Sequence, residues 1–402
     1  MKEFSKMKTI EDFNFKGKKV LIRVDFNVPL NHNRQITDDT RIKESLPTIS
    51  KILEDGASVI LMTHLGRPKG GYEHDYSLTT IVPVLSKFLN KNVIFTRDLF
   101  SDKTKKVAAA LKPGEVMLLE NLRFYKEEEK PNEAFAKDLA SLADCYVNDA
   151  FATSHRNHTS IATIAKFFPN NKYFGLLLAS EIKNLNKILY DAKPPFTAVL
   201  GGAKISSKIG IIKNLIDKVD NMIIGGGMSY TFIKALGGSI GNSLVENDRL
   251  EDARSFVQEM MLKGVKLYLP IDACIAEGFS ELEDFKMCDI DKIPSHMMGL
   301  DMGKRTRRRF AEIINKSNTI LWNGPVGVFE MERFKQGTKA LAISVAGATI
   351  SGSFSLVGGG DSVAAINEYN LADQISYVST GGGAMLEYVE GKELPGVQAL
   401  LT

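Results

Sequence analysis

The sequence predicts an α/β protein with two doubly wound parallel-sheet domains. Short apolar runs rich in β-branched residues recur along the chain, and helix-patterned segments of ten or more residues separate them. This alternation favours parallel strands that helices cover on both faces. It occurs in both halves of a chain of 402 residues, a length that itself favours two hydrophobic cores.

The elements follow in order from these patterns. The sequence predicts strands at 20–24, 58–62, 116–119, 197–200, 221–224, 266–269, 319–322 and 354–357. It predicts helices at 41–54, 132–143, 206–218 and 248–263. A further amphipathic helix at 179–190 ends before Pro194 and Pro195, because proline cannot continue a helix. The join between the domains is therefore expected near 180–196.

Composition excludes several classes of protein. The chain is 44% hydrophobic and 25% charged, which is ordinary for a soluble globular protein. A net charge of +3 argues against nucleic acid as a partner. Cys145, Cys274 and Cys288 are too few and too scattered for a disulfide framework or a zinc site. Without an apolar signal core or a membrane-length apolar stretch, we expect a cytoplasmic enzyme that binds no membrane.

Glycine is concentrated in the second half, where 26 of the 33 glycines follow residue 200. They cluster at 201–202, 225–227, 358–360 and 381–383, each after a short apolar run. In open α/β sheets ligands bind at the carboxyl ends of the strands, and free N–H groups at helix starts bind phosphate. These clusters therefore predict a site for a phosphate chain, although neither a P-loop nor a complete G-x-G-x-x-G motif is present.

Polar residues beside these clusters complete the expected site. Ser206 or Ser207 is a candidate helix N-cap, and Lys204 and Lys208 share a face if that helix begins near Lys204. Asp361 opens another helix, either as a plain N-cap or as a ligand of magnesium that bridges phosphates; both alternatives remain open.

The segment 320–330 contains the turn Gly324-Pro325. Val326 and Val328 would form a wall for a flat base, and Glu330 would accept hydrogen bonds from ribose hydroxyls. The alternative is an ordinary loop.

In the first half, charged and polar side chains follow the strands instead. They are Asp25 and Asn27, then His64 and Arg67 with Gly66 in the turn, then Asn121 and Arg123, then His155 and Arg156, with Arg41 at a helix start. A single arginine at a strand end is usually a surface ion-pair partner, but four strand ends repeat the pattern. Together they predict a site for a small substrate that carries phosphate and carboxylate. The acidic run 127–129 is interpreted as a solvated face.

Eight motifs give the chain a close resemblance to the phosphoglycerate kinase family. In order they are VDFNVP, HLGRP, ENLRF, SHR, LGGAK, NGPVGVFE, VGGGDS and STGGGAMLE, and they extend from about residue 18 to residue 402. The resemblance implies two Rossmann-like domains joined by a hinge helix. It implies reversible phosphoryl transfer between 1,3-bisphosphoglycerate and ADP, giving 3-phosphoglycerate and ATP, with Mg²⁺. It also favours a monomer.

The matching motifs imply the site residues. The substrate site would contain Asp25, Asn27, Arg41, His64, Leu65, Gly66, Arg67, Arg123 and Arg156. The nucleotide site would contain Gly202, Lys204, Lys208, Asn323, Glu330, Gly359, Gly360, Asp361 and Ser362, with Asp361 at the metal. Arg41, Lys204 and Lys208 would be catalytic.

The implied domains are 1–180 with the returning tail 388–402, a hinge helix and linker at 181–196, and 197–387.

Two departures from the family pattern are visible. Ser362 stands where the family usually has Thr, which keeps the hydroxyl. Lys304 stands where the family commonly has Pro, and a basic run to Arg309 follows it. We interpret this run as a solvated face, with a weak polyanion contact as the alternative.

Two other functional classes are considered. A NAD-dependent dehydrogenase would need a complete G-x-G-x-x-G motif and an acidic residue after the next strand, and neither is found. A two-domain solute-binding protein would normally carry a secretory signal, and the N-terminal residues show no apolar signal core. Such a protein would also not need the lysine pair beside the glycine turn at 201–202.

Overall fold

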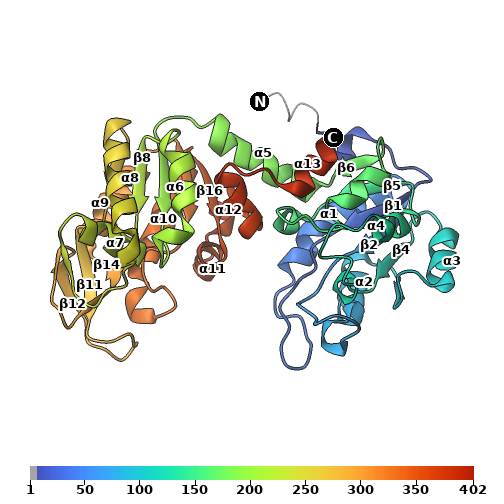
Figure 1. The fold of residues 1–402 in the computed structure, drawn as a ribbon, viewed down its shortest axis with the longest axis horizontal. Coiled ribbons are helices and arrows are strands. Elements are labelled where there is room, and N and C mark those ends of the chain that lie inside the picture. Colours follow the sequence, from blue (N-terminus) through green and yellow to red (C-terminus); the bar gives the residue numbers. More distant parts are fainter. Residues whose placement is uncertain (1–6) are drawn as a thin grey trace. The chain divides into compact units, whose positions relative to one another are not determined.

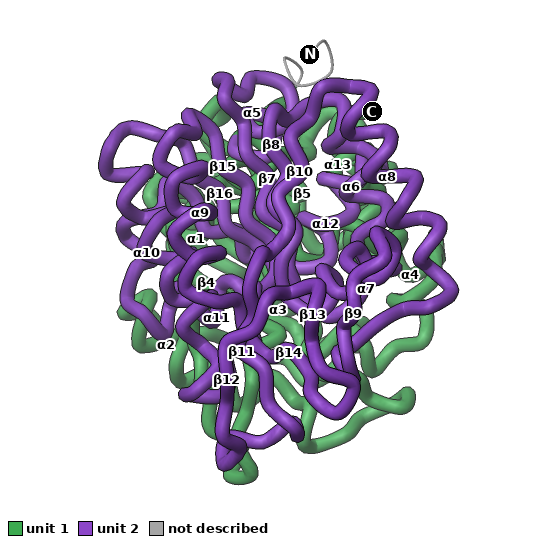
Figure 2. The backbone as a smooth tube through the Cα atoms, turned by 90° about the vertical axis from the view of Figure 1, so that its left-hand side faces the viewer, with its two compact units in different colours: residues 1–183, 393–402 green, residues 184–392 purple. Residues whose placement is uncertain are grey.

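The computed structural model describes residues 7–402, and it is an α/β protein as the sequence predicts (Figure 1). The chain forms two compact units, residues 1–183 with 393–402 and residues 184–392 (Figure 2). Each unit contains one six-stranded sheet. No helix in the described part of the chain is both long and apolar enough to span a bilayer.

The first unit is built on a sheet in which every strand pair is parallel. Its order is β3 (Val93–Thr96), β4 (Val116–Leu119), β2 (Ser58–Met62), β1 (Lys19–Arg23), β5 (Cys145–Asn148) and β6 (Lys172–Phe174). Its helices are α1 (Thr40–Glu54), α2 (Val82–Leu89), α3 (Asp102–Ala110), α4 (Glu133–Ala140), the first half of α5 (Leu176–Tyr190) and α13 (Pro395–Leu401).

Alternating residues of these strands enter one core. Val20 and Ile22 of β1 lie in a buried cluster with Ile49 of α1 and Leu85 of α2. The intervening Leu21 of β1 is equally buried, on the opposite face. A sheet buried on both faces explains why its strands are near-continuous apolar runs in the sequence.

The second unit repeats the architecture with a sheet in which every strand pair is again parallel. Its order is β10 (Lys266–Tyr268), β8 (Asn221–Ile224), β7 (Phe196–Leu200), β15 (Thr319–Asn323), β16 (Phe354–Gly358) and β17 (Tyr377–Ser379). Its helices include α6 (Ile209–Ile216), α7 (Met228–Ala235), α8 (Leu250–Leu262), α9 (Lys304–Ile314), α10 (Gln336–Ile350), α11 (Gly360–Glu368) and α12 (Gly383–Val389).

Two small sheets in this unit were not predicted from the sequence. One is antiparallel and has the order β12 (Lys286–Asp289), β11 (Asp272–Ala276) and β14 (Met298–Met302). The other pairs β13 (Lys292–Ile293) with β9 (Ser239–Ile240). No residue of β12 is buried, and β13 has only two residues, so no apolar run marks either strand in the sequence.

The helix predicted at 179–190 begins three residues earlier, at Leu176. The buried carboxylate of Asp149 explains this start, because its Oδ1 accepts hydrogen bonds from the backbone N–H groups of Leu177 at 2.9 Å and Leu178 at 3.3 Å. The division between the two units falls within this helix, between residues 183 and 184.

The helix predicted at 206–218 departs further from the structure, where the corresponding helix is α6 (Ile209–Ile216). A 3₁₀ turn, η8 (Ile205–Ser207), precedes α6, and Lys208 occupies the N-cap position of α6. Ser206 Oγ donates to Glu246 Oε1 at 2.6 Å and Ser207 Oγ donates to the Lys204 carbonyl at 2.8 Å. The predicted serine N-cap is therefore wrong, and so is the shared helical face of Lys204 and Lys208.

The basic run beginning at Lys304 forms the first turns of α9. Lys304 is the first helical residue, a position that favours proline without requiring it. Arg305 forms ion pairs with Asp272 and Asp289, and Arg309 lies 5.4 Å from the centroid of the Tyr268 ring. The substitution of Lys for Pro therefore leaves a regular helix start.

Candidate active site

The polar residues predicted in the first unit follow four neighbouring strands. These strands are β4, β2, β1 and β5, which are adjacent in the sheet and parallel. Their carboxyl ends therefore lie at one edge. Asp25 and Asn27 follow β1, the segment 64–67 follows β2, Arg123 follows β4, and Arg156 follows β5.

At the end of β1, Asp25 connects the strand to a helix. Its carboxylate is buried and forms an ion pair with the guanidinium of Arg41, in the first turn of α1. Asp25 Oδ1 also accepts the backbone N–H of Asn27 at 3.1 Å. Asn27 Oδ1 in turn accepts the Gly66 N–H at 2.8 Å. The ends of β1 and β2 are thereby held together by side chains.

At the end of β4, Asn121 and Arg123 hold the turn that follows β2. The amide of the fully buried Asn121 bonds both the N–H of Leu65 at 3.2 Å and its carbonyl at 2.7 Å. Arg123 NH1 donates to the Gly66 carbonyl at 2.6 Å. Gly66 has φ +63°, and a Cβ there would lie 2.2 Å from the ring of Tyr76. Only glycine fits this turn.

His64 is surrounded by arginines and is 3% exposed. Burial, followed by the charges of Arg23, Arg123, Arg156 and Arg41, lowers the pKa of His64 well below its usual value, so the ring is neutral at pH 7. The Nε atom of Arg156 is buried and lacks a hydrogen-bond partner. The Nε atom of Arg123 is buried and also lacks a hydrogen bond, and its ion-pair partner is the exposed carboxylate of Glu129 at 3.4 Å. Unsatisfied buried donors are costly, and a bound anion would satisfy them.

Arg67 is the one predicted substrate residue that the structure leaves apart from the others. It is exposed, and no hydrogen bond or ion pair within residues 7–402 connects its side chain to the group. The structure therefore brings Asp25, Asn27, Arg41, His64, Leu65, Gly66, Arg123 and Arg156 together at one edge of the sheet.

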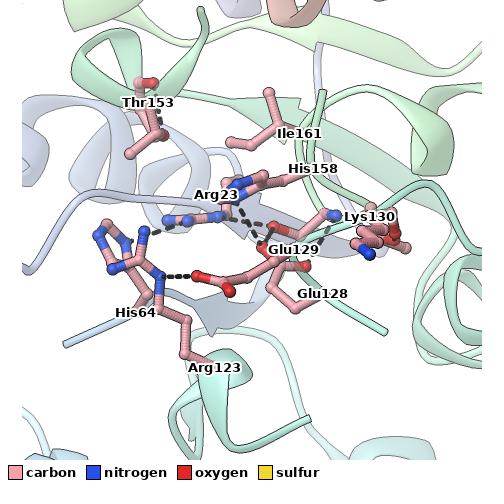
Figure 3. Close-up of polar contacts among 12 residues, drawn as sticks. Arg23, His64, Arg123, Glu128, Glu129, Lys130, Thr153, His158 and Ile161 are labelled. Atoms are coloured by element: carbon pink, nitrogen blue, oxygen red, sulfur yellow. Dashed lines mark hydrogen bonds and ion pairs between the residues drawn. The ribbon is translucent and has the colours of Figure 1, made fainter. Parts of the chain in front are cut away.

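A buried layer behind these residues was missed by the sequence reasoning (Figure 3). Glu128 is fully buried and accepts hydrogen bonds from Ser160, so the interpretation of 127–129 as a solvated face is wrong for this residue. Arg23 is also fully buried and donates from Nε to Ser160 Oγ at 2.8 Å. An arginine inside the apolar run 20–24 was the available signal.

In the second unit the predicted nucleotide residues follow three adjacent strands, β7, β15 and β16. Asn323, the last residue of β15, connects the other two strand ends. Its Oδ1 accepts the Nζ of Lys208, and its Nδ2 donates to the Gly358 carbonyl at 2.6 Å. Ser362 Oγ accepts the Gly324 N–H at 2.6 Å. The three strand ends therefore share one hydrogen-bond network.

The two lysines of this unit occupy different environments. Burial of Lys208 lowers its pKa to about 8. The negative charges of Asp361 and Glu390 raise this pKa and so oppose the shift. Lys204 is exposed at the edge of the glycine turn. The glycine turn itself is tight, because the Gly202 N–H donates to the Pro325 carbonyl at 2.8 Å.

A cavity of about 340 Å³ opens beside this network, a volume typical of small-molecule sites. Gly202, Glu330 and Asp361 line it, as do Val326 and Val328. Sequence reasoning did not identify other lining residues, which include Tyr230, Leu244, Asp301 and Met298. The wall is mainly apolar with a few polar groups, as a flat base and a ribose require.

Asp361 lies in the first turn of α11, whose N-cap is Gly359. The N-cap alternative for Asp361 is therefore wrong. Its carboxylate is exposed, and its charge raises the pKa of the nearby Lys208. No group of three His, Cys, Asp or Glu residues that could hold a metal ion occurs in the described chain. Asp361 fits a magnesium ion whose other ligands are phosphate oxygens and water, which is how nucleotide-bound Mg²⁺ is usually held.

Comparisons with known proteins agree over nearly the whole chain. A family model described as phosphoglycerate kinase matches residues 10–392. A phosphoglycerate kinase from Porphyromonas gingivalis is 50% identical over 416 aligned residues, which cover 98% of this chain and 99% of that one.

Two solved structures are similar to this chain over nearly its whole length. The phosphoglycerate kinase from Coxiella burnetii has a TM-score of 0.90 at 43% identity, and the one from Pyrococcus horikoshii OT3 has a TM-score of 0.82 at 33% identity. Each comparison covers 98% of both chains.

Proposed function

This chain belongs to the phosphoglycerate kinase family, and we propose how its two units divide the family's reaction between them. The enzyme transfers a phosphoryl group reversibly between 1,3-bisphosphoglycerate and ADP, giving 3-phosphoglycerate and ATP in glycolysis. The family assignment excludes both the dehydrogenase and the solute-binding protein. In our proposal the first unit binds the phosphoglycerate and the second binds the nucleotide.

The unsatisfied donors in the first unit carry the substrate assignment. The Nε atom of Arg156 is buried without a hydrogen-bond partner, and that of Arg123 has only the exposed Glu129 carboxylate 3.4 Å away, both near a neutral His64. A small molecule with a phosphate at one end and a carboxylate at the other would satisfy such donors. The proposed substrate residues are Asp25, Asn27, Arg41, His64, Leu65, Gly66, Arg67, Arg123 and Arg156.

The network of the second unit supports the nucleotide assignment. The base would lie in the cavity against Val326 and Val328, and the ribose hydroxyls would donate to Glu330. Lys208, held by Asn323, would bind the phosphates. The proposed nucleotide residues are Gly202, Lys204, Lys208, Asn323, Glu330, Gly359, Gly360, Asp361 and Ser362.

The transfer needs no nucleophile from the protein, because a substrate oxygen attacks the phosphorus atom. The protein positions the two ligands, neutralises charge and excludes water. Arg41 and Lys204 would stabilise the charge on the transferred group. Asp361 would hold Mg²⁺, which supplies positive charge to the nucleotide phosphates when it is bound.

Since the two ligand sites belong to different units, we propose that a hinge movement brings them together before the transfer. The proposed domains are 1–180 with 388–402, and 197–387, with the hinge at 181–196. We further propose a cytoplasmic monomer. Light scattering after gel filtration measures the mass, and a value of twice the 44.4 kDa chain would contradict the monomer.

The catalytic roles are tested by Arg41→Ala and Lys204→Ala. The purified variants are mixed with Mg·ATP and 3-phosphoglycerate, and ADP release is followed. We expect kcat to fall by several orders of magnitude with an unchanged thermal unfolding curve, because both cations contact the reacting group. Lys213→Ala, an exposed lysine of α6, is the control and should keep wild-type turnover. Near-wild-type kcat in Arg41→Ala or Lys204→Ala would contradict the assigned role.

A further inference from the structure

Arg23 is a buried cation at the end of β1 whose donors point in three directions. Its side chain is fully buried. One terminal nitrogen donates to the Val24 carbonyl, Nε donates to Ser160 Oγ at 2.8 Å, and the other terminal nitrogen lies 3.2 Å from His64 Nδ1. These contacts fix the guanidinium plane in one orientation, because its donors form a rigid fork.

The carboxylate that balances the charge of Arg23 is Glu128, and Ser160 connects the two side chains by hydrogen bonds. The Ser160 hydroxyl accepts from Arg23 and donates to Glu128 Oε1 at 2.6 Å, while the Ser160 backbone N–H donates to Glu128 Oε2 at 3.0 Å. Both oxygens of Glu128 are thereby used as acceptors. Burial raises the pKa of Glu128, and the positive charge of Arg23 opposes that shift.

His158 does not supply a charge to this layer. Its Nδ1 lies 3.9 Å from Glu128 Oε1, but burial and the nearby arginines lower the pKa of His158 to about 3. The ring is therefore neutral, and the contact is not an ion pair. Glu128 is left as the carboxylate that balances Arg23 across Ser160.

The contact with Arg23 decides which nitrogen of His64 carries the proton. Arginine has donors and no acceptor, so His64 Nδ1 must accept the hydrogen bond. A neutral imidazole carries one proton, which then sits on Nε2. The Nε2–H group is a donor, the form suited to an anionic ligand.

We propose that Glu128 and Ser160 are positioning residues, which hold Arg23 so that it fixes His64 in the Nε2–H tautomer as a neutral donor for the phosphoglycerate. This inference rests on the proposed substrate role of His64. It adds a buried relay, Glu128–Ser160–Arg23–His64, that acts on the substrate only through its last member.

The acidic run 127–129 contains its own matched control. Glu127 and Glu128 are neighbours with the same side chain, but Glu127 is exposed and Glu128 is fully buried. Glu128→Gln removes the charge with little change of shape, and Glu127→Gln makes the same chemical change outside the relay. Arg23→Lys is a second variant, because a lysine keeps the charge and loses the rigid fork.

The first measurement is the tautomer of His64 in the ligand-free enzyme. Long-range ¹H–¹⁵N correlation spectra of ¹⁵N-histidine-labelled protein distinguish protonated from unprotonated ring nitrogens, and His64→Gln identifies the signal by its loss. We expect an Nε2–H ring in the wild type and in Glu127→Gln. In Glu128→Gln and Arg23→Lys we expect both tautomers. An Nδ1–H or doubly protonated ring in the wild type at pH 7 would overturn the proposal, whether or not the variants fold.

The second measurement separates positioning from general stability. In Glu128→Gln we expect the KM for 3-phosphoglycerate to rise about tenfold, with kcat and the KM for Mg·ATP within about twofold of the wild type. Glu127→Gln should match the wild type in all three. Unchanged kinetics in both Glu128→Gln and Arg23→Lys, or equal changes in both KM values, would refute the relay. A wild-type KM in His64→Gln would instead contradict the substrate role of His64, while the tautomer result still decides the positioning.

Discussion

If Lys208 binds the nucleotide phosphates as proposed, we expect nucleotide binding to depend on pH in a range where few groups titrate. The Lys208 side chain is 8% exposed, and Nζ donates to Asn323 Oδ1. Burial lowers its pKa to about 8, although Asp361 and Glu390 oppose the shift. A pKa below that of an ordinary lysine means that the folded, ligand-free enzyme loses this charge as the pH rises through 8.

The size of the expected change in nucleotide affinity follows from the fraction of Lys208 that is charged. With a pKa of about 8, that fraction falls from about three-quarters at pH 7.5 to about one-tenth at pH 9. If only the charged form binds phosphate, the affinity for Mg·ADP falls by the same ratio, about eightfold. Phosphate groups are already ionised in this range, so the ligand contributes little. Asp301, which lines the cavity, has a pKa raised to about 7 by burial and titrates mainly below this range.

Isothermal titration calorimetry at constant ionic strength measures this affinity across the range. The wild type should bind Mg·ADP about eightfold more weakly at pH 9 than at pH 7.5. Lys208→Arg should bind with an affinity that does not change over the same range, because arginine stays charged. A flat wild-type profile, or the same decrease in Lys208→Arg, would refute the role of this lysine.

Three further predictions concern the second unit. Asp361→Asn should raise the magnesium concentration for half-maximal turnover about tenfold, because a neutral amide is a weaker Mg²⁺ ligand. The KM for 3-phosphoglycerate should stay unchanged, and a titration of the rate with magnesium checks the first result. Gly359→Ala should weaken ATP binding at least about tenfold, measured as KM, because φ is +95° and a Cβ would lie 2.3 Å from Asn323 Nδ2. Gly347→Ala, at an exposed position in the last turn of α10 (Gln336–Ile350) with open space for a Cβ, should raise the free energy of unfolding by up to about 1 kcal/mol in urea denaturation.

The strands were predictable because burial on both faces marks them directly. The runs 58–62 and 116–119 match β2 and β4 residue for residue, and every residue in them is buried. The start of α6 was missed because it depends on an unpredicted 3₁₀ turn and on Glu246, which binds Ser206 from 40 residues away.

The site could be anticipated only where it follows the strand pattern. Residues after strands, such as Asp25 and Asn323, are visible from their place in the sequence. Arg23 gave only the signal of an arginine inside an apolar run, and Glu128 gave none. The burial of a charge depends on distant partners: Ser160 is 137 residues from Arg23 and 32 from Glu128. Periodicity therefore assigned Arg23 to an apolar strand and Glu128 to the surface.

The central claim is that the two units hold different ligands, the first with side chains and the second around a glycine-rich network. Hydrogen–deuterium exchange of the enzyme with each ligand alone tests it most directly. With 3-phosphoglycerate alone we expect protection of the segments 25–27, 64–67 and 121–123; with Mg·ADP alone we expect protection of 201–208, 323–330 and 358–362. Protection of the second set by 3-phosphoglycerate alone, or of the first set by Mg·ADP alone, would contradict the account.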